Sequence, residues 1–163
     1  MTQLMVTRFN NNTKNENTRW REKNDFLGCI YNSPVHIKET IPLMITIFVI
    51  EMNNDENKIL GFGKIKNKVY TDKKYRIYED RNYNRYTYRG EKRIDIENIT
   101  NITNIDNIDN KKLKENQDNI KKLEKRLFKG KSHLKRGHGI TQLPIDIKNE
   151  YLKLITELFL STT

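Results

Sequence analysis

The sequence contains a single cysteine, Cys29, among its 163 residues. One thiol excludes an intrachain disulfide and also excludes the clustered thiolates of a zinc ribbon. Such sparse use of cysteine fits a reducing compartment. We therefore expect an intracellular protein rather than a secreted one.

Long apolar segments are also missing. The longest apolar run, Met44 to Ile50, is interrupted by Thr46 and is far shorter than the roughly 20 residues that span a bilayer. The stretch from Arg8 to Asp25 is polar, which does not suit a signal peptide. Neither a membrane partner nor secretion is expected.

Alanine is absent, whereas Asn, Lys and Ile supply 62 of the 163 residues. Those three amino acids have A/T-rich codons and alanine has G/C-rich codons, so the bias indicates an AT-rich genome. Residues 98–112 repeat Asn-Ile-Thr and Asn-Ile-Asp without helical or strand periodicity, and we interpret them as a low-complexity surface loop.

Two regions of different character follow from the apolar pattern. Residues 1–24 hold few apolar side chains and predict a flexible polar leader, with Trp20 as its anchor. Residues 25–163 predict a single basic domain of ordinary size.

Within that domain, β-branched and aromatic runs predict strands at 27–31, 45–52, 58–67, 86–89 and 93–96. The second and third should form a hairpin, and a turn at Arg89-Gly90 could join the last two. Gly61 and Gly63 suggest a bulge, a close backbone approach or a simple bend. Helical spacing predicts helices at 113–128 and 147–160. The expected fold is α+β, a small curved and mostly antiparallel β-sheet or barrel with flanking helices.

Positive charge is concentrated in two windows. The chain has 31 Lys+Arg and 21 Asp+Glu, a net charge of +10, yet residues 64–93 alone carry +7 and residues 125–138 carry +6. The remainder is slightly acidic, so the pattern predicts a basic surface for a polyanion, with solubility alone as the alternative.

The first window also holds six of the eight tyrosines. Rings interleaved with arginine suit single-stranded nucleic acid, because rings stack on bases and guanidinium groups pair with phosphates. We predict phosphate contacts from Arg76, Arg81, Arg85 and Arg89 and base stacking by Tyr83, Tyr86 and Tyr88. The alternative is that about half of these rings pack on the sheet.

The second window combines three glycines with cations between Phe128 and Gly139. Glycine lets the backbone approach a phosphate, and cations neutralise it. The predicted contacts are Lys131, His133, Lys135, Arg136 and His138, and the alternative is a plain surface loop. Gly-Lys-Ser at 130–132 lacks the upstream glycine of a nucleotide-binding loop, which argues against an NTPase.

No complete catalytic or metal-binding set is evident. His133 and His138 have no cysteine partner, and Cys29 sits in an apolar strand pattern typical of a buried thiol. Glu79 and Asp80 would point to opposite sides of a strand. We expect no enzyme activity, no cofactor and no metal.

Three phrases carry a family resemblance: residues 28–34 (GCIYNSP), 48–66 (FVIEMNNDENKILGFGKIK) and 129–144 (KGKSHLKRGHGITQLP). They resemble an uncharacterised family of large nucleocytoplasmic DNA viruses of the mimivirus type. The resemblance implies a location in the host cytoplasm, the nucleus or the virion.

The run from Ile59 to Ile65 (ILGFGKI) is also similar to the PUA-like group, including EVE and ASCH domains. That resemblance implies a small barrel that recognises RNA or modified DNA bases, although base-pocket residues cannot be carried over one by one.

The first hypothesis is therefore a nucleic-acid-binding domain that uses the tyrosine–arginine face and the glycine–lysine loop. The second is a viral structural or interaction protein whose basic face meets an acidic partner or binds the genome without base selectivity. A homodimer formed through the C-terminal helix would support the second.

Overall fold

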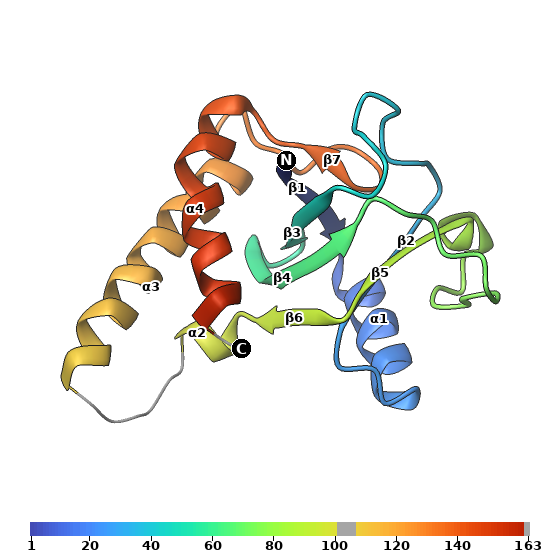
Figure 1. Ribbon diagram of the computed structural model, residues 1–163, viewed down its shortest axis with the longest axis horizontal. Coiled ribbons are helices and arrows are strands. Elements are labelled where there is room, and N and C mark those ends of the chain that lie inside the picture. Colours follow the sequence, from blue (N-terminus) through green and yellow to red (C-terminus); the bar gives the residue numbers. More distant parts are fainter. Residues whose placement is uncertain (101–106, 162–163) are drawn as a thin grey trace.

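The computed structural model describes residues 1–100 and 107–161 of the chain (Figure 1). The elements in order are β1 (Thr2–Phe9), α1 (Asn11–Lys23), β2 (Cys29–Ser33), β3 (Thr46–Asn53), β4 (Lys58–Lys66), η1 (Arg81–Asn84), β5 (Tyr86–Gly90), β6 (Lys92–Asp95), α2 (Glu97–Thr100), α3 (Asn107–Phe128), β7 (Thr141–Gln142) and α4 (Ile145–Ser161). The fold is α+β, as the sequence predicts.

The strands form two sheets. A five-stranded mixed sheet has the order β6-β4-β3-β1-β7, with β1 parallel to β3 and the other neighbours antiparallel. A second sheet pairs β2 with β5. Among the described strands, β6 and β7 end the large sheet at opposite edges, so the barrel considered from the sequence is wrong and the sheet stays open.

The N-terminal segment is part of this sheet, so the prediction of a flexible leader at residues 1–24 is wrong. Strand β1 lies between β3 and β7, and Leu4, Met5 and Val6 are almost completely buried. Helix α1 follows at once, because the Asn10 and Thr13 side chains form a reciprocal capping box at its N-terminus. A domain boundary at residue 25 would cut through the sheet.

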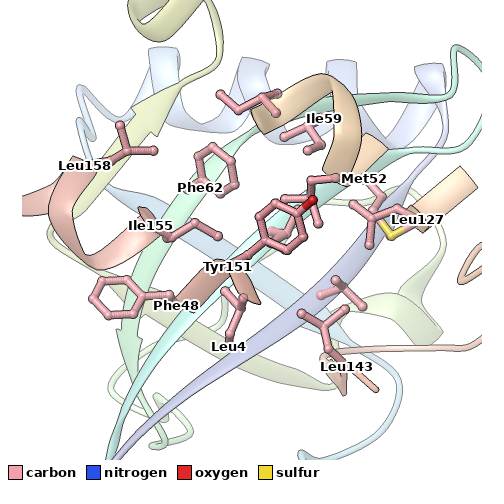
Figure 2. Close-up of a cluster of buried hydrophobic side chains, with 14 of the residues drawn as sticks. Leu4, Phe48, Met52, Ile59, Phe62, Leu127, Leu143, Tyr151, Ile155 and Leu158 are labelled. Atoms are coloured by element: carbon pink, nitrogen blue, oxygen red, sulfur yellow. The ribbon is translucent and has the colours of Figure 1, made fainter. Parts of the chain in front are cut away.

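The large sheet is covered on both faces (Figure 1). On one face, residues of β1, β3 and β4 such as Leu4, Phe48 and Phe62 pack against α3 and α4, as Figure 2 shows around Tyr151 and Ile155. On the other face, alternate residues such as Val49 and Ile65 pack against the small sheet. Burial on both faces explains why β3 reads as a continuous apolar run.

The predicted hairpin is confirmed as β3 and β4. Its register shifts between Glu51 and Met52, where Leu60, the neighbour of Gly61, is the extra residue on β4. The close approach is confirmed as well. A Cβ on Gly63 would lie 2.0 Å from Tyr31 Oη and 2.7 Å from Cys29 Sγ, so the small sheet can reach β4 only because this residue is glycine.

The expected hairpin between the strands at 86–89 and 93–96 does not form. β5 pairs with β2, whereas β6 pairs with β4, so the chain passes from one sheet to the other at Gly90. A Cβ on Gly90 would lie 1.8 Å from the Lys64 carbonyl oxygen, which explains the glycine by proximity to β4 rather than by a turn.

Both predicted helices are confirmed, and both are longer than expected. α4 spans Ile145–Ser161, and α3 begins at Asn107, so residues 107–112 belong to a helix rather than a loop. Residues 98–100 lie in α2, and 101–106 fall outside the described residues. The C-terminal half of α3 is packed in the core, with Leu123 and Leu127 buried. The helix continues into the polar residues before this half because extending an existing helix by a turn costs less free energy than nucleating a new one. Among the described residues, none of the helices has the length and apolar character needed to cross a bilayer.

Candidate nucleic-acid interface

Two cavities, of about 740 and 430 Å³, lie along the segment that leads from β4 to η1 and β5. The larger is lined by that segment alone, and the smaller lies between the segment and α1. They share Lys73, Lys74 and Arg76. We call their combined lining the basic groove. Its cationic side chains come from both elements and are Arg19, Lys23, Lys73, Lys74, Arg76, Arg81 and Arg85.

These seven cations face little negative charge. The groove lining contains two carboxylates, Glu16 and Glu79. The ion pairs among the described residues are made by Arg93 and Arg126, not by any cation of the groove. A concave surface with uncompensated charge of one sign focuses its field and attracts the opposite charge.

The groove wall between Tyr75 and Asn84 is held by side-chain amides instead of regular strands. Asn84 Oδ1 accepts hydrogen bonds from the backbone N–H of Ile77 (3.2 Å) and of Tyr78 (3.0 Å). The Asn84 Nδ2 donates to the Tyr78 carbonyl at 2.6 Å, and the Asn32 Nδ2 donates to Asn84 Oδ1 at 2.9 Å. Arg76 and Arg81 are therefore carried on a loop fixed to β2.

Three of the predicted phosphate contacts, Arg76, Arg81 and Arg85, line the groove. Arg89 does not line either cavity. Its guanidinium carbon lies 4.5 Å from the Tyr70 ring centre and 5.7 Å from that of Tyr75, and its Nε is buried. The rings that surround Arg89 make it a packing residue on the inner side of the groove wall.

The three tyrosines predicted to stack on bases also differ in how far they are buried. Tyr88 is only 2% exposed, and its hydroxyl accepts a hydrogen bond from the Ile37 N–H, so the prediction that it stacks on a base is wrong. Tyr86 is half-buried with its ring centre 3.6 Å from that of His36. Tyr83 is 37% exposed and is the stacking candidate that remains open to solvent.

A third cavity, of about 210 Å³, lies beside the groove, and Tyr78 lines both. We call it the end pocket. Its walls combine aromatic rings, neutral amides and hydroxyls, one arginine and the Gly137–Gly139 loop; the residues that matter below are Arg8, Phe9, Asn54, Tyr83 and His138. The structure thus brings His138 from the second basic window to Tyr83 from the first.

The other predicted contacts of the second window have different surroundings. His133 Nδ1 accepts a hydrogen bond from the Lys135 N–H at 3.3 Å, and the Lys135 carbonyl accepts one from Asn54 Nδ2 at 2.8 Å. Lys131 and Arg136 are exposed. The loop is therefore anchored to the body of the protein through backbone groups, while its cationic ends face solvent.

A buried polar cluster of Glu51, Arg93 and Asp95 lines a further cavity together with residues of α1. Glu51 receives hydrogen bonds from Arg93 Nη2 (2.6 Å) and Tyr31 Oη (2.6 Å), and Arg93 Nη1 donates to Asp95 at 3.0 Å. These groups satisfy one another and join β2, β3 and β6. The cluster therefore serves the fold.

Cys29 is buried, as its sequence context predicts. Burial first, and then the nearby Glu51 charge, raise the pKa of the Cys29 thiol to about 12, which keeps it protonated at neutral pH. Such a thiol is a poor nucleophile. In the described parts of the chain, no group of His, Cys, Asp and Glu side chains is arranged to hold a metal ion.

Comparison of the chain with protein-family models, with curated proteins and with solved structures finds no match. The site is therefore defined by its own geometry and charge.

Sequence reasoning missed the contribution of the N-terminal segment to the candidate interface. Arg8, Arg19 and Lys23 lie on β1 and α1, which the polar composition had marked as a leader. A signal was present in the sequence, because Asn10 and Thr13 have the spacing of an N-cap and its third helical residue.

Proposed function

We propose that this protein binds single-stranded nucleic acid along the basic groove. The observation that carries the proposal is that seven cations, without ion-pair partners among the described residues, line two cavities that share three of these residues. Neutralising phosphates releases counterions, and this supplies most of the affinity of such surfaces.

Concavity favours a single strand over a duplex. The cations line two hollows along a loop, and α1 forms one side of the smaller hollow. A narrow, flexible strand can follow such a groove, with Tyr83 offering a ring to a base. The test below also compares RNA with DNA as the bound strand. The viral and PUA-like resemblances stay predictions.

The test is fluorescence anisotropy with labelled RNA, single-stranded DNA and duplex DNA of equal length, titrated from about 50 to 300 mM salt. The proposal expects both single strands to bind more tightly than the duplex at the upper salt concentration. Polyglutamate is added as a competitor of equal charge. Equal binding of all three nucleic acids, with equal competition by polyglutamate, would instead favour the interaction protein with an acidic partner.

A charge-reversal variant tests whether nucleic acid binds in the basic groove. Lys74, Arg76 and Arg81 are exposed, and the described side chains give them no ion-pair partner, so their replacement by Glu should leave the fold intact. The matched control replaces Lys111, Lys114 and Lys122, which are exposed on α3, by Glu. Circular dichroism checks both folds.

We expect the groove variant to reduce the slope of log K against log salt by about 2, because each phosphate contact to a single strand contributes about 0.7. The control should keep the slope of the unmodified protein. An equal reduction in both variants would mean that net charge alone drives binding, and the groove would not be the site.

A further inference from the structure

Arg8 lies half-buried in the wall of the end pocket without a counter-charge. Its Nε donates to the Leu134 carbonyl at 2.7 Å and its Nη1 donates to Thr141 Oγ1 at 2.8 Å, and both acceptors are neutral. No carboxylate of the described residues forms an ion pair with it, and the end-pocket lining contains no Asp or Glu. A partly desolvated cation in a pocket free of acids is stabilised by an anion.

The loop beside this arginine is shaped for close approach of the backbone. Gly137 has φ +125°, and a Cβ there would lie 3.1 Å from Arg8 Nη1 and 3.4 Å from Nη2. Gly139 has φ +74°, and a Cβ there would lie 2.4 Å from Ser33 Oγ. Loops of this kind leave peptide groups accessible to a small anion such as phosphate. His138, exposed between the two glycines, also lines the pocket.

Size and position indicate which anion fits. The end pocket measures about 210 Å³, below the roughly 300–1,000 Å³ of clefts that take larger ligands, so it suits one small group instead of a continuing chain. It adjoins the basic groove at Tyr78, and Tyr83 and Phe9 supply aromatic surface beside Arg8. A strand in the groove that enters this pocket would therefore end there.

We propose that the end pocket holds the terminal phosphate of the bound strand on Arg8 and His138, and that the base of the terminal nucleotide contacts the Tyr83 ring. This inference rests on the proposed function, since it assigns the end of the same strand. It makes the protein a reader of phosphorylated strand ends rather than of internal sequence.

The first experiment changes the ligand and leaves the protein unmodified. Three strands of identical sequence and about 12 nucleotides, within the usual site size for such proteins, carry a 5′-phosphate, a 3′-phosphate or hydroxyls at both ends. We expect one phosphorylated strand to bind about tenfold more tightly than the unphosphorylated one, the gain of a charge-assisted hydrogen bond. The preferred end also gives the direction of the strand.

The second experiment tests whether the preference for a terminal phosphate arises in the end pocket. Arg8→Gln keeps donors for neutral acceptors and removes the charge, and His138→Ala removes an exposed side chain. Both should reduce the ratio of the affinities for the phosphorylated and unphosphorylated strands from about ten to about one. Lys121→Gln, exposed on α3, is the matched control and should keep the preference.

The outcomes separate the two proposals. Equal affinity for the three strands, in a protein whose binding is still weakened by the groove variant, would overturn the terminal-phosphate site and leave the groove standing. A preference that survives both Arg8→Gln and His138→Ala would also overturn it. Failure of every strand to bind would overturn the groove, and the end-pocket proposal with it.

Discussion

Glu51 and Arg93 form a bidentate pair inside the protein, with Arg93 Nη2 2.6 Å from Glu51 Oε1 and Nε 3.0 Å from Oε2. Their side chains are only 4% and 9% exposed. The pair joins β3 to β6 across β4, and the Tyr31 hydroxyl adds β2 from the small sheet. One carboxylate thus connects the two sheets.

Replacing this carboxylate should be costly. Glu51→Gln leaves Arg93 buried with Asp95 as its remaining partner, and we expect the free energy of unfolding to fall by about 3 kcal/mol. Asp95→Asn is the control, because that carboxylate is 45% exposed and should contribute less than about 1 kcal/mol. Urea denaturation measures both, and equal losses would contradict the role assigned to Glu51.

The Cys29 thiol should be unreactive in the folded protein. Because its pKa is raised to about 12, a thiol reagent at pH 8 should label it at the rate of global unfolding. Addition of urea should accelerate labelling strongly. Rapid labelling of the native protein would show that Cys29 is accessible.

The same shift makes stability depend on pH. The folded pKa of Cys29 lies above the ordinary value of 9.0, so its contribution is complete below about pH 9 and is lost as pH rises toward 12. Going from pH 8 to pH 10.5 should therefore destabilise the unmodified protein more than Cys29→Val. Parallel losses, followed by urea denaturation, would argue against the shift.

Asn84 should control affinity without contributing charge. Asn84→Ala removes the amide that binds the Ile77 and Tyr78 backbone, so we expect a loss of about 2 kcal/mol in stability and a weaker complex with single strands. Asn82→Ala, exposed in η1, is the matched control. Anisotropy and urea denaturation are measured on both; unchanged affinity in Asn84→Ala would mean that the groove does not need its fixed wall.

Tyr83 should contribute to single-strand affinity by stacking on a base and should not contribute to its salt dependence. Tyr83→Ala is expected to weaken single-strand binding about tenfold, since stacking on a ring contributes about 1 to 3 kcal/mol per base. The salt slope should not change. Tyr83→Phe keeps the ring and should restore the affinity; if it binds as weakly as Tyr83→Ala, the hydroxyl rather than the ring is the contact.

Substitution of Gly130 and of Gly139 should distinguish the cost of backbone strain from the cost of a steric clash. Gly130 has φ +81° and open space around its Cβ position, so Gly130→Ala should cost about 1 kcal/mol. Gly139→Ala adds a clash with Ser33 Oγ and should cost about 3 kcal/mol. Thermal or urea unfolding compares the two, and equal losses would show that the loop can move away from Ser33.

Local patterns in the sequence were enough for the helices α3 and α4, the β3–β4 hairpin and the buried thiol. Each depends on spacing within one segment: apolar residues at helical intervals, a β-branched run followed by a turn, or a cysteine among apolar neighbours. The two cationic windows were also evident, because the number of charged residues in a segment can be read from the sequence without knowing the fold.

Only the tertiary structure decided how those pieces meet. β1 was predicted to belong to a polar leader, yet it is an interior strand of the sheet, because β3 pairs along its whole length and β7 pairs with Met5 and Val6 on the other side. Tyr88 and Arg89 are the same residue types as Tyr83 and Arg85, but their side chains pack against other parts of the protein. The reason is that β5 pairs with β2 and contacts β4. Which cation faces a groove and which faces a ring depends on partners distant in sequence, and periodicity along the chain carries no information about them.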